Sequence, residues 1–115
     1  MSKEEPSRTQ LLQGTLDLIV LQTLASMGPQ HGYGLAQRIQ QVSEDLLHLN
    51  QGTVYPALLR LQQQGSIESE WGTSENNRQA KYYSITRAGR KMLSAETERW
   101  RQFSGFVSKI LGNPA

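Results

Sequence analysis

Two groups of polar residues have side chains of the kind that hydrogen bond to nucleic acid. One group lies in the segment 51–63 and the other in the segment 76–81. Glutamine and threonine can read base edges in the major groove, whereas arginine and lysine bind guanine or phosphate. The predicted DNA-contacting residues are Gln51, Thr53, Tyr55, Pro56, Arg60, Asn76, Asn77, Arg78 and Lys81.

Residue types that support catalysis or metal binding are scarce. The chain has no cysteine, which excludes disulfides, thiolate metal sites and cysteine nucleophiles. Its two histidines, His31 and His48, are far apart in sequence and have no acidic cluster beside them. The sequence also lacks a nucleophile–base pair, a carboxylate dyad and a phosphate-binding glycine loop. We therefore expect no enzymatic activity, no metal and no cofactor.

Length and composition indicate one folded domain. A chain of 115 residues with 37% hydrophobic and 19% charged residues fits a single hydrophobic core. The net charge of +2 does not by itself identify a nucleic-acid partner, although basic residues become more frequent from mid-chain onward. Because no segment resembles a secretory signal or a membrane span, we expect a cytoplasmic protein.

The elements that must position the polar groups follow from hydrophobic periodicity. It predicts helices over 10–27, 32–43 and 51–64, strands over 66–71 and 81–85, and a last helix over 87–111. This order is typical of a mainly helical winged helix-turn-helix with a small antiparallel β-wing. The apolar run 46–49 fits either an edge strand or an irregular connector.

The expected organisation has one DNA-binding domain and one dimerisation helix. Residues 10–86 form the winged helix-turn-helix and 87–111 the C-terminal dimerisation helix. Residues 1–9 are expected to be a frayed N-terminus and 112–115 a tail.

The third predicted helix would present the first polar group. Val54, Leu58 and Leu61 have the spacing of a core-facing side, so the polar residues between them point outward. Pro56 lacks an N–H group and disfavours a helical conformation in the residue before it. The start of this helix therefore stays open between residues 51 and 53.

The two predicted strands would carry the second polar group. The nine residues 72–80 between them predict an extended, mobile loop rather than a tight turn. Tyr82 and Tyr83 are adjacent on a strand, so their side chains point to opposite faces. Trp71 is expected in the core or at its edge.

The last predicted helix has more apolar surface than one small core can cover. A helix of about 24 residues is about 36 Å long, so part of its apolar stripe needs a second chain. The predicted dimerisation residues are Leu12, Leu16, Leu93, Trp100, Phe103, Val107 and Ile110. Trp100 and Phe103 are also the predicted binding residues for a small effector.

Several motifs occur in the order found in one family of bacterial regulators. They are Gly14–Asp17, His31–Gly34, Asn50–Leu61, Gly65–Ile67, Glu70–Trp71 and Arg78–Gly89. On these motifs the chain, from Leu11 to Trp100, resembles the PadR family of winged-helix transcriptional regulators in its short-tailed form. The resemblance implies a homodimer whose last helix crosses to the partner, repression of nearby promoters, and release by a small hydrophobic or aromatic effector. The chain departs from the family pattern at Gln62–Gln64 and at Ser66.

Two hypotheses of different classes follow. The leading one is a homodimeric repressor that binds a near-palindromic double-stranded DNA operator, with reading helices about 34 to 36 Å apart. The alternative is a winged-helix protein-interaction module without sequence-specific DNA binding, which the modest net charge favours.

Overall fold

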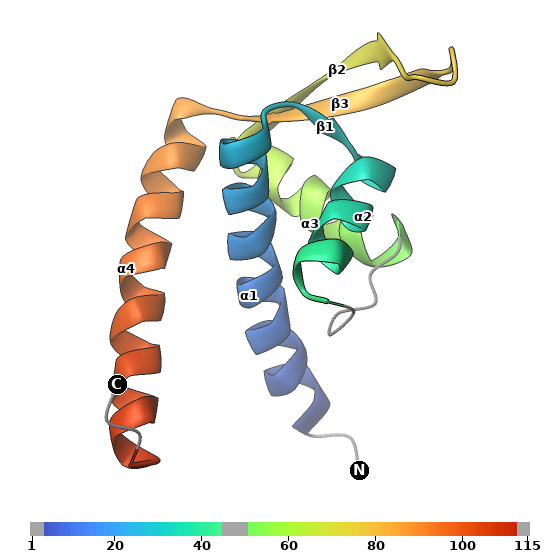
Figure 1. Ribbon diagram of the computed structural model, residues 1–115. Coiled ribbons are helices and arrows are strands. Elements are labelled where there is room, and N and C mark those ends of the chain that lie inside the picture. The colour runs from blue at the N-terminus through green and yellow to red at the C-terminus, as the bar shows by residue number, and fades with distance from the viewer. Residues whose placement is uncertain (1–3, 45–50, 113–115) are drawn as a thin grey trace.

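The computed structural model describes the backbone of residues 4–44 and 51–112, and the side chains of residues 14–44 and 52–112. The elements, shown in Figure 1, are α1 (Glu4–Met27), β1 (Gln30–His31), α2 (Gly32–Val42), α3 (Gln51–Gln63), β2 (Ile67–Thr73), β3 (Gln79–Ile85) and α4 (Arg87–Ile110). The helices and the two longer strands follow the predicted order, so the predicted fold class is confirmed.

Three details differ from the sequence-based prediction. The first helix begins at Glu4, six residues before the start at residue 10 that the sequence predicted. Strand β1 was not predicted, because two residues are too few to show a periodicity. Helix α3 begins at Gln51 and includes Pro56, which settles the open position of its start. The connector 46–49 and His48 lie outside the described residues.

The strands form one antiparallel sheet in the order β1-β3-β2. Ile67 pairs with Ile85, Trp71 with Lys81, and β1 extends the sheet by pairing Gln30 with Tyr83. Beyond the body of the domain, β2 and β3 continue as a two-stranded wing (Figure 1).

The wing ends in a short turn, and the prediction of a mobile loop over 72–80 is wrong. Both strands extend further than expected, which leaves only residues 74–78 between them. The Ser74 N–H donates to the Arg78 carbonyl at 2.8 Å, and the Asn77 N–H donates to the Ser74 carbonyl at 2.9 Å. Asn77 adopts a φ of 61°, a left-handed conformation that asparagine tolerates well.

The core lies where α1, α2 and α3 meet the base of the sheet. Its fully buried members include Leu24 of α1, Leu35 of α2, Leu58 of α3 and Ile67 of β2. Leu58 shares its buried face with Val54, Ala57 and Leu61, so the predicted inward side of the third helix is confirmed. Burial of this face fixes which side chains of α3 face solvent.

A compact joint connects α3, the sheet and α4. Gly65 adopts a φ of 79° and ends α3, and the following Ser66 N–H donates to the Leu61 carbonyl at 2.9 Å. The Thr86 hydroxyl donates to the Gly65 carbonyl at 2.7 Å and accepts from the Gly89 N–H at 3.0 Å. Thr86 is therefore the N-cap of α4, and it also holds that helix to the end of α3.

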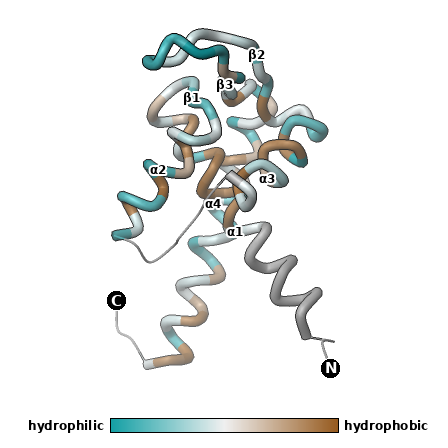
Figure 2. Tube along the Cα trace, turned by 90° about the vertical axis from the view of Figure 1, so that its right-hand side faces the viewer, coloured by the Kyte–Doolittle hydropathy of each residue, from teal (hydrophilic) through white to brown (hydrophobic). Residues whose placement is uncertain are grey.

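Helix α4 runs along α1 and then continues beyond the body of the domain (Figures 1 and 2). The radius of gyration is 15.6 Å, compared with about 13 Å for a compact domain of similar size. Met92 and Leu93, near the start of α4, pack against the core, whereas Figure 2 shows hydrophobic segments in its projecting half. In that half, the apolar side chains of Trp100, Phe103, Phe106 and Ile110 are exposed.

Candidate nucleic-acid interface

The start of α3 is the exposed part of the proposed reading helix. Thr53, Tyr55 and Pro56 are exposed, and the side chain of Gln51 lies outside the described residues. These positions follow from burial of the opposite face of α3 in the core. The helix therefore presents a hydroxyl group, a phenol ring and a proline ring to solvent in its first two turns.

Arg60 forms an ion pair within the chain, although the sequence predicted a DNA contact for it. Its Nη2 lies 2.8 Å from Oδ1 of Asp17 in α1, and the two side chains are only 29% and 17% exposed. The guanidinium therefore lies between α3 and α1, about two helical turns along α3 from Thr53. The sequence could not reveal this pair, because its partners are 43 positions apart.

The start of α2 lies beside α3 and below the wing. Nδ1 of His31 accepts a hydrogen bond from the Gly34 N–H at 3.0 Å and so caps this helix. The His31 ring also packs edge-on against Tyr82, with ring centroids 5.3 Å apart. The next aromatic residue, Tyr33, is exposed, and its hydroxyl accepts from the Gln37 amide at 3.2 Å.

The two faces of the wing differ in charge and in burial. Trp71 and Lys81 pair across the strands on the face that continues inward to Ile67 and Ile85. On the opposite face, Glu68 and Glu70 are both exposed. One face of the wing is thus aromatic and cationic, and the other is acidic along β2.

Trp71 does not lie in the core, and that prediction is wrong. It follows the alternation of Ile67 and Ser69, but the wing has already left the body of the domain at this position. The side chain is 66% exposed, and Nζ of Lys81 lies 5.7 Å from the centroid of its ring. This distance is within the range of a cation–π contact.

Tyr82 and Tyr83 point to opposite faces of the sheet, as predicted. Tyr83 is buried with the core, and Tyr82 is half-buried beside His31. Burial raises the pKa of the Tyr83 phenol, and the neighbouring Tyr55 raises that pKa further. Tyr83, at the buried base of the wing, therefore lies close to Tyr55, at the exposed start of α3.

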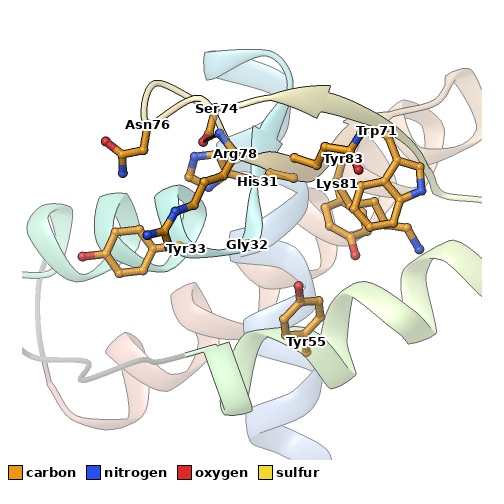
Figure 3. Close-up of a pocket in the computed structure, with 12 residues that line it drawn as sticks. His31, Gly32, Tyr33, Tyr55, Trp71, Ser74, Asn76, Arg78, Lys81 and Tyr83 are labelled. Atoms are coloured by element: carbon orange, nitrogen blue, oxygen red, sulfur yellow. Dashed lines mark hydrogen bonds between the residues drawn. The ribbon is translucent and has the colours of Figure 1, made fainter.

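A cleft of about 450 Å³ lies between the wing, the start of α2 and the start of α3. Figure 3 shows Tyr55 pointing from α3 toward the wing, and side chains of the wing lining the other side. Arg78 and Lys81 supply two positive charges, and none of the described residues that line the cleft carries a carboxylate. Such a surface is suited to a polyanion.

The cleft brings together some of the predicted DNA contacts and adds others. Tyr55, Asn76, Arg78 and Lys81 line it. Thr53 and Pro56 lie on the same helix but do not line the cleft, and Arg60 is turned toward α1. The residues that sequence reasoning missed are His31, Tyr33 and Trp71. The motifs His31–Gly34 and Glu70–Trp71 contained the only sequence signal for them.

The predicted dimerisation residues lie away from this cleft and fall into two sets. Trp100, Phe103 and Ile110 are exposed on α4, and Val107 is half-buried. Leu16 and Leu93 pack against the core of their own chain. This part of the predicted dimer surface is therefore already partly covered within the chain. The side chain of Leu12 lies outside the described residues.

Two further apolar residues of α4 and its end belong to the same exposed surface. Phe106 and Leu111 are both exposed, although the predicted dimerisation residues did not include them. Trp100 and Phe103 also line a cavity of about 270 Å³ between α4 and the Gly14–Leu18 turn of α1. Their rings lie 6.4 Å apart and are tilted by 43°.

The described residues contain neither a metal-binding cluster nor a membrane-spanning helix. No group of three or more histidine, cysteine or acidic side chains in the described part of the chain is placed to hold a metal ion. Over the same residues, no helix combines the length and hydropathy needed to cross a membrane.

Helices α2 and α3 followed by the β2–β3 hairpin define a winged helix-turn-helix protein with an additional long C-terminal helix. Residues 20–95 match the family model described as the transcriptional regulator PadR-like family. The chain belongs to this family, and it is a transcriptional regulator.

Solved structures of bacterial regulators share this fold over nearly their whole length. A transcriptional regulator from Clostridium thermocellum is 29% identical, with a TM-score of 0.77 over 87% of this chain and 96% of that one. A PadR-like regulator from Bacillus cereus is 29% identical, with a TM-score of 0.75 over 89% and 96%. A PadR family regulator from Eggerthella lenta is 30% identical, with a TM-score of 0.74 over 92% and 90%.

Proposed function

We propose that this chain is a homodimeric repressor that binds a near-palindromic double-stranded DNA operator through α3 and the wing. The observation that carries the proposal is the cleft, where the exposed start of α3 meets a wing face with two cations. A reading helix beside a cationic wing is the arrangement with which this class of fold docks on a duplex.

The two parts of the surface have different tasks in this proposal. The start of α3, with Gln51, Thr53, Tyr55 and Pro56, enters the major groove and contacts base edges. Asn76, Asn77, Arg78 and Lys81 of the wing hold the phosphate backbone and fix the register. Sequence preference thus comes from α3, whereas the salt dependence of binding comes mainly from the wing.

Dimerisation is proposed to occur through α4. Trp100, Phe103, Phe106 and Ile110 expose an apolar face that is unusual for the surface of a monomer. A second copy of the chain can cover this face and bring two reading helices to the same side of a duplex.

Release by a small hydrophobic or aromatic effector is the third part of the proposal. The cavity beside Trp100 and Phe103 lies next to the proposed dimer surface, so a ligand bound there would change how two subunits meet. Titration of the dimer with planar aromatic compounds should quench tryptophan fluorescence. The absence of quenching across a broad panel, with intact dimers, would argue against an effector at this place.

The DNA-binding proposal is tested with a duplex that contains the region upstream of the chain's own gene. We expect a gel shift that competitor DNA of unrelated sequence removes only at high excess. Thr53→Ala should reduce the preference for this duplex, and Arg78→Ala should weaken binding to all duplexes. Gln102→Ala, an exposed position on the polar side of α4 and outside the cleft, serves as the control. A protein that binds both duplexes equally would contradict sequence-specific binding.

A further inference from the structure

Three exposed aromatic side chains border the cleft. Trp71 is 66% exposed, Tyr33 55% and Tyr55 48%. They come from the wing, α2 and α3, so elements distant in sequence place aromatic rings around one opening (Figure 3). Trp71 is the most exposed of the three, and keeping a tryptophan in water forgoes the free energy of burying a large apolar surface. This cost suggests that a partner covers the ring.

The position of Trp71 identifies the side from which that partner comes. The antiparallel register places Trp71 opposite Lys81, and both line the cleft. The other face of β2 carries Glu68 and Glu70, which are exposed. A polyanion is therefore attracted to the face with Trp71 and repelled by the opposite face.

We infer that Trp71 is a DNA-contacting residue that, together with Lys81, binds the sugar–phosphate backbone of duplex DNA in the cleft. The ammonium group of Lys81 contacts a phosphate, and the indole ring of Trp71 covers the apolar edge of the adjacent deoxyribose. This inference rests on the proposed function, because it specifies how the proposed DNA site holds its ligand.

The chemistry of the pair favours backbone over base recognition. Nζ of Lys81 lies 5.7 Å from the ring centroid of Trp71, so the cation and the ring form one unit with a charged end and an apolar face. A nucleotide backbone alternates charged phosphate and apolar sugar in the same way. Neither side chain forms a bidentate pair with a base edge, and the contact therefore strengthens binding to all sequences alike.

Fluorescence offers a direct test, because the chain contains only two tryptophans. In the Trp100→Phe variant, Trp71 is the sole tryptophan and reports on the cleft. Titration with a 30-base-pair duplex of arbitrary sequence at low salt should quench and shift the Trp71 emission. The matched variant Trp71→Phe, which retains Trp100, should show no comparable quenching. An unchanged Trp71 emission under conditions where a gel shift proves binding would overturn the inference.

A second readout is independent of any effect of Trp100→Phe on assembly. The unaltered chain labelled with 5-fluorotryptophan gives one ¹⁹F NMR resonance for each tryptophan, and the two single variants assign them. Addition of duplex should move the Trp71 resonance more than the Trp100 resonance. A larger movement of the Trp100 resonance would contradict a DNA contact at Trp71.

Affinity measurements separate the roles of the two residues. Trp71→Ala should weaken binding about tenfold for specific and arbitrary duplexes alike, because apolar contact area is lost, and the salt dependence should not change because no charge is lost. Lys81→Gln should make the negative slope of log K against log salt shallower by about 0.9, the value for one lost phosphate contact. Glu70→Gln, on the opposite face of the wing, is the control and should not weaken binding.

The outcomes distinguish this inference from the function on which it rests. Absence of binding to every duplex would overturn the proposed DNA binding and the role of Trp71 together. Normal binding by Trp71→Ala would overturn only the role of Trp71. Trp71→Ala could instead lose the preference for the specific duplex and keep its affinity for arbitrary duplexes. That result would show that Trp71 reads bases and would contradict the backbone contact.

Discussion

At the scale of single residues, the ion pair between Arg60 and Asp17 changes the role that we assign to Arg60. The sequence predicted a DNA contact, but the guanidinium lies 2.8 Å from a carboxylate of α1. We propose that Arg60 is a positioning residue, which holds the reading helix α3 at a fixed angle to α1. A buried or half-buried ion pair is costly to break, because the remaining charge loses its partner.

This role predicts a specific pattern for Arg60→Gln. We expect the free energy of unfolding to fall by about 1–2 kcal/mol, because Asp17 loses its charged partner. DNA affinity should also fall, while the slope of log K against log salt stays unchanged, because no phosphate contact is lost. Urea denaturation and binding isotherms at several salt concentrations measure these quantities.

Arg78→Gln is the matched control for this prediction. It should make the negative slope of log K against log salt shallower by about 0.9, because one phosphate contact is lost. The free energy of unfolding should change little, because Arg78 is exposed on the wing. Asp17→Asn should resemble Arg60→Gln, and the double variant should lose little more than either single one. A reduced salt slope in Arg60→Gln would instead support the original prediction of a phosphate contact.

The buried phenol of Tyr83 predicts a dependence of stability on alkaline pH. Burial, and then the neighbouring Tyr55, raises its pKa in the folded chain above the ordinary value of 10.0. The unfolded chain therefore loses this proton first as the pH rises, so unfolding becomes easier. The Tyr83 contribution to stability should be complete below pH 10 and should decrease above it.

Tyr83→Phe should remove this contribution to the pH dependence. Denaturation of both proteins between pH 8 and 11 should show a shallower loss of stability above pH 10 in the variant. The same steepness in both proteins would contradict burial of the phenol as its cause.

Residue-scale prediction from sequence succeeded where a periodic pattern determines burial. The inward positions Val54, Leu58 and Leu61 are buried as predicted, because helical geometry fixes the face once the core is known. It failed for Trp71, because strand alternation defines a face but not the point at which that face leaves the core. It also missed the partner of Arg60, which is distant in sequence.

At the scale of elements, the sequence determined the order but not the short connections. Strand β1 has two residues and depends on pairing with β3, which no local pattern reveals. The wing turn is shorter than expected, because Thr73 and Gln79 are polar and yet continue the ladder on an exposed hairpin. Polar composition is thus a poor guide to strand ends in an element that solvent surrounds.

The start of α4 packs so closely on the sheet that Gly89 tolerates no side chain. A Cβ atom at this position would lie 2.0 Å from the Ser66 carbonyl oxygen and 2.8 Å from Cγ1 of Ile85. The backbone oxygen cannot move without disturbing the Thr86 N–H, which donates to it at 3.0 Å. We expect Gly89→Ala to lower the free energy of unfolding by at least about 2 kcal/mol.

Gly105 on the same helix is the matched control for Gly89. No atom lies within 4 Å of a Cβ placed there, so Gly105→Ala should raise helix stability by about 0.5–1 kcal/mol. Thermal denaturation of the two variants compares them directly. Equal effects in the two variants would show that α4 does not need its close contact with Ser66.

At the scale of the whole molecule, α4 has two functions along its length. Its first turns are fixed to the joint around Thr86 and pack against the core, whereas its later turns expose Trp100, Phe103 and Ile110. The sequence predicted this surplus of apolar surface from the length of the helix and its apolar stripe, and it included Leu93 among the dimerisation residues. Leu93 also packs against the core of its own chain, because α4 runs beside α1 before it extends beyond the domain.

If the exposed half of α4 forms the dimer interface, a charge placed in it should abolish dimerisation and tight operator binding together. Phe103→Glu places a charge in the proposed dimer face, and light scattering should give a mass near 12.9 kDa instead of twice that value. Gln102→Glu adds the same charge on the polar side of α4 and should remain dimeric. A dimer of Phe103→Glu with unchanged mass would place the interface elsewhere.

Operator geometry then tests the whole assembly, because a rigid dimer fixes the distance between its two reading helices. The Gln102→Glu dimer should bind two half-sites about 34 to 36 Å apart and should lose most of this affinity when about five base pairs, half a helical turn, are inserted between them. The Phe103→Glu monomer should bind both duplexes equally weakly, since each chain then engages one half-site alone. Tight binding by this monomer, with the same dependence on spacing as the dimer, would show that α4 does not link the reading helices.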